Sequence, residues 1–164
     1  MYLLHIELSK LFKGDKKLMK KIKIKYHNKK LEKNYSIKQM DNSDWIDLRA
    51  GETVTLKKGD SALISLGVSM ELPKGYEALV IPRSSTFKKH GIIQTNHVGL
   101  IDNSYNSDTD IWKYPVYAMR NTTIHEGDRI CQFRIQKSMG KIKFNIVEEL
   151  NNNERGGFGS TGVQ

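Results

Sequence analysis

The stretch "SALISLGVSMELPKGYEALVIP", residues 61–82, decides the fold class because two β-rich runs flank a single turn. The runs "SALISLGVSMEL" and "YEALVIP" are short and follow the period-two pattern of strands. The turn between them, "LPKGY", contains Pro73 and Gly75, which favour a reversal of the chain.

The same pattern continues along the chain. Further β-rich runs are "DWIDLRA", "HVGLID", "YPVYAMR", "DRICQFRI" and "KIKFNIVEE", separated by turns such as "KKGD", "KKHG", "DNSYNSD", "HEGD" and "NNNERGG". Helical periodicity is absent apart from an ambiguous stretch at 29–40, and "SSTFKKHG" predicts one helical turn with a Ser or Thr cap, ended by Gly91. We therefore predict a single all-β domain, a β-barrel or jelly roll.

Composition limits the class of protein. The 164 residues suffice for one domain, and 38% hydrophobic with 27% charged residues is an ordinary soluble mixture. Apolar runs are too short to span a bilayer, and the first residues do not resemble a signal peptide. One cysteine, Cys131, excludes an intramolecular disulfide. We expect a cytoplasmic protein without a membrane partner.

The net charge of +9 comes from one stretch. Between Lys10 and Lys38 there are twelve lysines and only two acidic residues, whereas the rest of the chain has 15 basic and 16 acidic residues. A nucleic-acid-binding surface would carry basic residues interleaved with aromatics on the folded domain. A solvated basic segment is favoured over a nucleic-acid-binding arm.

The basic stretch also contains a second candidate start. Met19 opens "MKKIKIKY", in which Ile22, Ile24 and Tyr26 alternate with lysines as in a half-buried edge strand. Residues 1–18 have no counterpart in the rest of the pattern. We interpret them as an upstream extension.

Metal chemistry is restricted by the ligands present. The five histidines show no ligand spacing, so a structural zinc site is not expected. Magnesium remains open because Mg²⁺ needs only one or two carboxylates plus the phosphates of a substrate. A Walker-type glycine loop and a Gly-x-Ser-x-Gly elbow are both absent from the sequence.

The segment "LVIPRSSTFKKHG" offers an anion-binding site. An apolar strand ends at Pro82 and is followed by Arg83, Ser84 and Ser85. Arg provides a planar charged fork, and the serines provide hydroxyl and backbone N–H donors. The alternative is a strand followed by an ordinary capped turn.

The segment "QTNHVGLIDNSYNSD" offers a candidate general base and side chains that could bind a nucleobase or sugar ring. Asp102 ends an apolar run, where a carboxylate would be partly shielded and usable as a general base. Tyr105 could lie flat against a ring, and the amide of Asn96 could match a base edge. The alternative is an ordinary hairpin with an Asn/Asp turn.

Two further segments add donors. In "EGDRICQFRI", Gln132 lies inside an apolar strand. The terminal "NNNERGGFGSTGVQ" combines glycines that let the backbone approach a phosphate with a charge, hydroxyls and a stacking face. These contributions come from Arg155, Ser160, Thr161 and Phe158.

Together, in this order, the motifs resemble one family. The segments "DWIDLRA", "PRSS", "NHVGLIDNSY", "GDRICQ" and "RGGFGSTG" look like the five ordered motifs of the trimeric dUTPases, over roughly Met19 to Gly162. The resemblance implies a jelly-roll homotrimer, with active sites at subunit contacts and a C-terminal arm that closes over a neighbour's site. It divides the chain into an extension at 1–18, a dUTPase-like β-barrel domain at 19–150 and a flexible arm at 151–164.

The implied reaction is hydrolysis of dUTP to dUMP and pyrophosphate with Mg²⁺, which keeps uracil out of DNA and supplies dUMP for dTMP synthesis. By resemblance, Asp102 is the general base for water attacking the α-phosphorus, and Tyr105 packs against deoxyribose and rejects a 2′-hydroxyl. Asn96 reads the uracil edge together with the hairpin backbone at Gly99 and Ile101.

The resemblance assigns the remaining motif residues to the phosphate chain, the metal and the base. Asp47 lies near the metal, with water-mediated contact at most, since in the family the triphosphate and waters hold Mg²⁺. The phosphate contacts are implied for Arg83, Ser84, Ser85 and Gln132. In the last motif, Phe158 stacks on uracil, and the γ-phosphate is held by Gly159, Ser160 and Thr161.

Three departures from the family pattern stand out. Ser85 occupies the place of a glycine, and "RGGFG" brings Arg155 two residues closer to Phe158, which puts its reach to the γ-phosphate in doubt. The segment "NSDTDIWKYPVY" is longer than usual. One hypothesis is that Trp112 or Tyr114 shares or takes over uracil stacking; the alternative is a core or trimer-contact aromatic.

Two other functions are compatible with parts of the sequence. A dCTP deaminase shares the fold but needs a base such as Glu near cytosine, whereas this hairpin offers Asp102 leading to Tyr105. A regulatory or interaction module would use the basic N-terminal stretch or the "NSDTDIWKYP" insertion to bind a protein partner. With all five motifs present, catalysis is favoured, and a second regulatory role stays open.

Overall fold

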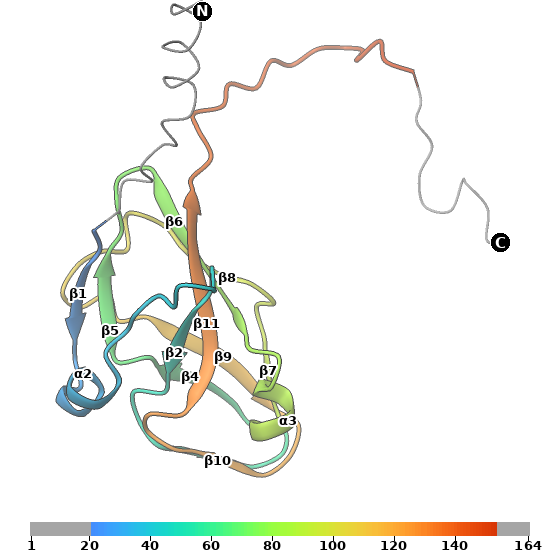
Figure 1. Ribbon diagram of the computed structural model, residues 1–164. Coiled ribbons are helices and arrows are strands. Elements are labelled where there is room, and N and C mark those ends of the chain that lie inside the picture. The colour runs from blue at the N-terminus through green and yellow to red at the C-terminus, as the bar shows by residue number, and fades with distance from the viewer. Residues whose placement is uncertain (1–20, 154–164) are drawn as a thin grey trace, which may run out of the picture.

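The computed structural model describes residues 21–153 and shows mainly short antiparallel strands (Figure 1). The predicted all-β class is confirmed. Eleven strands and two short helices occur in this range. They are, in order, β1 (Lys23–Tyr26), α2 (Lys29–Tyr35), β2 (Ile46–Arg49), β3 (Val54–Leu56), β4 (Ser61–Ser65), β5 (Val68–Glu71), β6 (Tyr76–Pro82), α3 (Thr86–His90), β7 (Ile92–Gln94), β8 (Gly99–Ile101), β9 (Lys113–Ala118), β10 (Thr122–Ile124) and β11 (Arg129–Lys137).

The strands divide among four antiparallel sheets instead of one closed barrel within the described residues. The sheet orders are β2-β11-β6-β8, β4-β9-β7, β1-β5 and β10-β3. The stretch 61–82 therefore supplies strands to three sheets. Its first run breaks at Gly67, whose φ of 66° is a left-handed conformation that favours glycine. A Cβ on the facing Gly51 would lie 2.7 Å from the backbone nitrogen of Gly67, so the chain can turn this corner only with glycine at both places.

The sheets enclose one apolar core. Trp112 and Phe133 meet edge to face at its centre, with ring centroids 5.3 Å apart. The backbone N–H of Trp112 donates to the Val68 carbonyl (2.8 Å), and its carbonyl accepts from the Leu66 N–H (2.9 Å). These bonds fasten the segment before β9 across the β4–β5 corner. The other large, fully buried side chains are Tyr114, Leu48, Ile64, Leu66, Ile92, Ile124, Ile130, Val68 and Val116.

The full burial of Trp112 and Tyr114 overturns one hypothesis. Both side chains are 0% exposed, so neither ring has a face available for uracil. The core alternative is confirmed. The local cause is the alternation along β9, which directs Tyr114, Val116 and Ala118 inward.

Helix α3 forms where one helical turn was predicted, and Gly91 ends it with a left-handed φ of 63°. The cap differs from the expectation. Ser85 occupies the N-cap position without a side-chain cap bond, whereas the Thr86 hydroxyl accepts from the Arg83 N–H (2.9 Å) and donates to the Ile130 carbonyl (2.9 Å). Thr86 therefore ties the end of β6 to β11.

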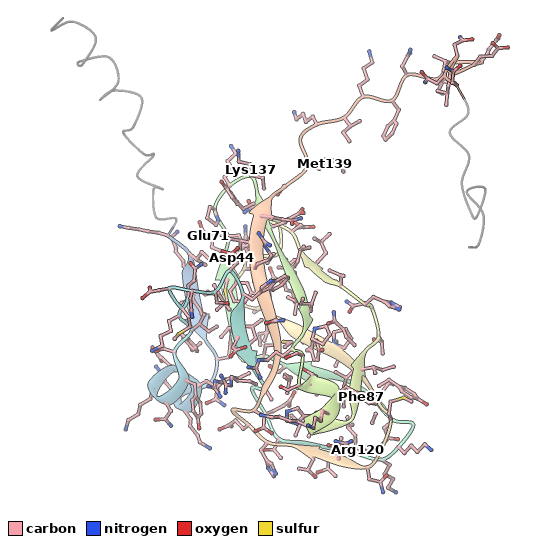
Figure 2. All side chains as sticks on the ribbon, turned by 45° about the vertical axis from the view of Figure 1, so that its right-hand side comes forward. Asp44, Glu71, Phe87, Arg120, Lys137 and Met139 are labelled. Atoms are coloured by element: carbon pink, nitrogen blue, oxygen red, sulfur yellow. The ribbon has the colours of Figure 1, made fainter. Side chains whose placement is uncertain are left out.

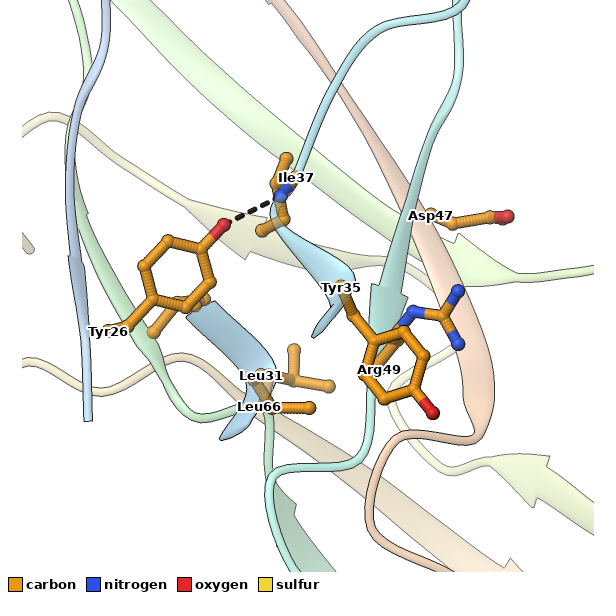
Figure 3. Close-up of a pocket in the computed structure, with 8 residues that line it drawn as sticks. Tyr26, Leu31, Tyr35, Ile37, Asp47, Arg49 and Leu66 are labelled. Atoms are coloured by element: carbon orange, nitrogen blue, oxygen red, sulfur yellow. Dashed lines mark hydrogen bonds between the residues drawn. The ribbon is translucent and has the colours of Figure 1, made fainter. Parts of the chain in front are cut away.

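The ambiguous stretch at 29–40 contains helix α2. Asn28 caps it, because its Oδ1 accepts from the N–H groups of Lys30 (2.9 Å) and Leu31 (3.2 Å). Strand β1 precedes the helix and pairs only with β5 among the described strands, which confirms the predicted edge position. The predicted half-burial holds only in part, because Tyr26 is partly buried whereas Ile24 is 38% exposed. The Tyr35 ring, 4.2 Å from the Arg49 guanidinium carbon, closes a small pocket between α2 and β2 (Figure 3).

The predicted strand "KIKFNIVEE" is the clearest error of the sequence pattern. Residues 138–153 form no strand and run away from the domain beyond the end of β11, from Met139 onward (Figures 1 and 2). Its alternating apolar side chains Ile142, Phe144 and Ile146 are 55%, 86% and 98% exposed. The pattern is that of a half-buried strand, but the single chain offers this segment no partner strand.

No helix within residues 21–153 has the length and apolar character needed to cross a membrane.

Candidate active site

The first part of the site is the turn between β7 and β8. Its tip adopts a left-handed φ of 56° at His97. Strand β8 pairs with β6, and Gly99 lies opposite Val80. A Cβ on Gly99 would approach the Val80 side chain to 3.2 Å, so glycine permits the close contact. Asn96 is thereby held at the tip with its side chain exposed.

The carboxylate of Asp102 follows directly after β8. Its Oδ1 accepts from the backbone N–H of Ser104 (2.7 Å) and from the Ser104 hydroxyl (2.5 Å). The hydroxyl bond, followed by the backbone bond, lowers the pKa of Asp102 below its usual value. Among the described residues, none donates to Oδ2. One oxygen of the carboxylate is thus fixed, and the other is open to a water molecule.

The predicted shielding of Asp102 is wrong for the single chain. The side chain is exposed, because Asp102 lies beyond the end of β8 in the turn that continues to Tyr105. The hydrogen bonds from Ser104 outweigh desolvation, so the pKa of Asp102 is lowered and not raised.

Tyr105 lies beside Asp102 with a fixed ring orientation. Its backbone N–H donates to the Asp102 carbonyl (3.3 Å), and its hydroxyl donates to the Ile111 carbonyl (3.1 Å). The ring remains 38% exposed. This leaves a planar apolar surface next to the carboxylate, as stacking on a sugar requires.

The second part of the site is a charged cluster on three neighbouring strands. Asp47 on β2 accepts from Arg83 Nε at Oδ1 (2.5 Å) and from Arg129 Nη1 at Oδ2 (3.1 Å). Arg83 follows the end of β6, and Arg129 begins β11. One carboxylate holds two guanidinium groups, so the cluster keeps a net positive charge suited to a phosphate chain.

The remaining predicted phosphate contacts gather at the same end of β6. Ser85 Oγ lies 3.5 Å from Arg83 Nη1, and Gln132 Nε2 donates to the Pro82 carbonyl (3.2 Å). Ser84 lies between Arg83 and Ser85 in the sequence, and its side chain is exposed. The structure therefore brings together Arg83, Ser84, Ser85 and Gln132.

The two parts lie at opposite ends of β6. Ile101, before Asp102, pairs with Ala78, whereas Arg83 follows Pro82. At about 3.3 Å per residue, Ala78 and Arg83 are roughly 17 Å apart along the strand, and Asp102 lies one residue beyond Ile101. The Asp102 turn and the Arg83 cluster are therefore separate from each other within the single chain.

Three residues of the site were missed from the sequence. Arg129 lies in "GDRICQ" and pairs with Asp47, Ser104 bonds to Asp102, and Gln94 donates from Nε2 to Asn96 Oδ1 (2.7 Å). The Asp-Asn-Ser turn could have indicated Ser104, since such residues bond locally in turns. Residues 1–18 and the predicted contacts of Arg155, Phe158, Gly159, Ser160 and Thr161 lie outside the described residues.

The described residues offer no preformed metal site. Within residues 21–153 there is no cluster of three or more His, Cys, Asp or Glu side chains able to hold an ion. Both Asp47 oxygens are in ion pairs with arginines, and these two positive charges disfavour direct coordination of a cation there. A metal bound mainly through a substrate's phosphates fits these residues.

Comparison with known proteins identifies the family of the chain. The dUTPase family model matches residues 38–162. The SPbeta prophage-derived deoxyuridine 5'-triphosphate nucleotidohydrolase of Bacillus subtilis (strain 168) is 54% identical over 143 residues, covering 87% of this chain and 99% of its own. The deoxyuridine 5'-triphosphate nucleotidohydrolase of Finegoldia magna is 43% identical over 126 residues, covering 73% of this chain and 85% of its own.

Solved structures show the same fold. A point mutant of the phage 80alpha dUTPase aligns with a TM-score of 0.71 at 22% identity, covering 87% of this chain and 99% of that one. The dUTPase from Streptococcus mutans aligns with a TM-score of 0.66 at 20% identity, covering 76% and 100%. The predicted jelly-roll fold of the dUTPase type is confirmed. The chain belongs to the dUTPase family and is an enzyme of that family.

Proposed function

We propose that this protein hydrolyses dUTP to dUMP and pyrophosphate, with Asp102 as the general base. The observation that carries the proposal is the Asp102 carboxylate, which is kept ionised by Ser104 and has one oxygen open, beside the exposed Tyr105 ring. The 54% identity to a deoxyuridine 5'-triphosphate nucleotidohydrolase supports the substrate.

The reaction is an in-line displacement. Asp102 Oδ2 accepts a proton from water as the water oxygen bonds to the α-phosphorus. The bond from the α-phosphorus to the bridging oxygen breaks, and its electron pair leaves with pyrophosphate. Arg83, held by Asp47, and Gln132 offset the charge that develops on the phosphate oxygens.

Base and sugar are recognised by the β7–β8 turn. Asn96 and the backbone at Gly99 and Ile101 bind the uracil edge, while Tyr105 packs against deoxyribose and leaves no room for a 2′-hydroxyl. The Tyr105 hydroxyl is bound to Ile111, which prevents the ring from turning away.

Mg²⁺ is proposed as the cofactor. The ion would be held by the triphosphate and by waters, with Asp47 in contact through water at most, and would screen charge on the phosphates. The solved structure of a mutant phage phi11 dUTPase aligns with this chain with a TM-score of 0.68 at 17% identity, and that protein coordinates a structural Mg(II) ion.

A homotrimer is proposed because one chain does not complete the site. The Asp102 turn and the Arg83 cluster lie at opposite ends of β6, so Asp102 of one subunit would act beside Arg83 of another. The exposed apolar side chains of residues 138–150 also need a covering surface. A neighbouring subunit supplies it, and the arm beyond residue 150 then reaches a neighbour's site.

Three sequence-based expectations stay predictions: the cytoplasmic location, the division into an extension, a domain and an arm, and a regulatory protein partner.

The rival dCTP deaminase would require ammonia release from dCTP. Following ammonia and pyrophosphate from dCTP and dUTP in parallel separates the two enzymes.

The decisive experiment uses Asp102→Asn. We expect wild type to release pyrophosphate from dUTP, and the variant to lose turnover while it binds dUTP with similar affinity, since only proton abstraction is removed. Light scattering should give the mass of three chains. Undiminished turnover in the variant would overturn the assignment of Asp102, and a monomeric, active enzyme would overturn the shared site.

A further inference from the structure

Gln94 is a polar side chain in an otherwise apolar place. It ends β7, where the strand's alternation turns it inward, and it is only 8% exposed. The other buried polar side chains among the described residues are Ser69 and Thr86. Gln94 packs against the two strands that carry Val80 and Gly99, directly beneath the turn that holds Asn96.

Its orientation is fixed by a backbone group. The Gln94 Nε2 atom lies 3.1 Å from the Val80 carbonyl oxygen, which can only accept a hydrogen bond. The amide group facing Val80 must therefore be the NH₂ end. The two possible orientations of the glutamine amide are distinguished by this contact alone.

The fixed glutamine in turn orients Asn96. The second N–H of Gln94 Nε2 points to the Asn96 amide at 2.7 Å, so the facing atom must be the acceptor Oδ1. Asn96 Nδ2 then lies on the other side of its amide, and it has no bond to a described residue. The chain Val80, Gln94, Asn96 leaves a pair of N–H donors on the exposed end.

The arrangement carries a cost that stability does not explain. Gln94 Oε1 is buried and has no hydrogen-bond partner among the described residues. A buried unsatisfied carbonyl is unfavourable, and an unbranched apolar side chain of similar length would avoid it. The glutamine therefore has a role other than stability, and its NH₂ group indicates which one, because it holds Asn96.

We propose that Gln94 is a positioning and specificity-determining residue that makes Asn96 present hydrogen-bond donors to the base. This rests on the proposed function, in which Asn96 reads the base edge. A donor facing position 4 of the pyrimidine bonds to the carbonyl oxygen of uracil and opposes the amino group of cytosine. Gln94 thus selects uracil over cytosine without touching the nucleotide.

The test is a double-mutant cycle with Gln94→Met and Asn96→Ala, measured as kcat/KM for dUTP and as inhibition by dCTP. Methionine keeps the length of the side chain and removes both amide bonds. We expect Gln94→Met to lower the dUTP over dCTP preference by roughly 3- to 10-fold, the range for losing one neutral hydrogen bond. The change should lie mainly in KM, since the reacting atoms are not touched.

The cycle separates positioning from packing. If Gln94 acts through Asn96, then Gln94→Met should change the preference little in the Asn96→Ala background. Full additivity of the two substitutions would overturn the proposal. The matched control is Gln39→Met, which removes an amide-to-carbonyl bond, Gln39 Nε2 to Ser43 O (3.2 Å), from a loop outside the turn and should leave the preference unchanged.

Folding and function are checked separately. A Gln94→Met protein that melts at the wild-type temperature yet loses preference supports the proposal, whereas a preference equal to wild type overturns it. If Gln94→Met does not fold, Gln94→Leu in the same cycle replaces it. Absence of dUTP hydrolysis by wild type would refute the proposed function itself. Hydrolysis with an additive cycle would refute only the assignment of Gln94.

Discussion

Replacing Trp112 with alanine tests the core assignment of this ring. The side chain is 0% exposed, and burial of about 200 Å² at ~25 cal/mol per Å² is worth about 5 kcal/mol. Residual burial in the unfolded chain reduces this by roughly 10–40%, and the contact with Phe133 adds about 1 kcal/mol. These contributions sum to about 4–5.5 kcal/mol, so we expect the free energy of unfolding to fall by about 4–5 kcal/mol, in the upper part of the usual range for such substitutions.

Phenylalanine at the same position is expected to cost much less. Trp112 Nε1 is buried without a hydrogen-bond partner among the described residues, and Trp112→Phe removes that unsatisfied donor together with part of the ring. The loss should stay below about 1.5 kcal/mol. Denaturant unfolding followed by circular dichroism at one fixed protein concentration measures both variants, because the stability of an oligomer depends on concentration.

The binding of a dUTP analogue by Trp112→Phe tests whether the ring acts in the site instead of the core. Trp112→Phe should bind a non-hydrolysable dUTP analogue as wild type does. If Trp112→Phe kept its stability and lost affinity tenfold, the ring would act in the site, and its assignment to the core would be refuted.

Three further predictions concern the base, the metal and a helix cap. Ser104→Ala removes the hydroxyl bond that does most to lower the pKa of Asp102, so the acid limb of the kcat profile should move to higher pH; an unmoved limb would show that Asp102 is not the titrating base. Chelation by EDTA should abolish pyrophosphate release and added Mg²⁺ should restore it, whereas full activity in EDTA would exclude the proposed cofactor. Asn28→Ala removes the cap of α2 and its bond to Glu126 (2.9 Å), and should lower the unfolding free energy by about 1–2 kcal/mol in a denaturant titration, with kcat unchanged. A loss near zero would mean that α2 adds nothing to global stability.

Local patterns predicted most strands but not how they pair. The run at 61–72 is one β-rich segment in sequence, yet Gly67 divides it between two sheets, because a left-handed glycine there meets Gly51 from a distant loop. The short strands β3, β7 and β10 carry too few residues for a period to be visible. Residues 141–149 show the converse: the alternation is present, but pairing depends on a surface that the segment itself does not encode.

The candidate site was predictable where a residue acts through its own chemistry. Asp102, Arg83 and Asn96 could be chosen because base, phosphate ligand and amide are recognisable residue types. Gln94 acts through another side chain, and only the turn geometry places it under Asn96. The burial of Trp112 likewise depends on contacts from β5 and β11, which no local pattern reports.

The ion pairs of Asp47 with Arg83 and Arg129 bear on how a nucleotide's phosphates would be bound. Arg83 and Arg129 both pair with the Asp47 carboxylate, which orients their guanidinium groups within the folded chain. Ordering a long side chain during binding costs roughly 0.5–1.5 kcal/mol, and here that ordering belongs to folding. Under the proposed function, a phosphate chain would therefore bind to guanidinium groups that Asp47 has already oriented.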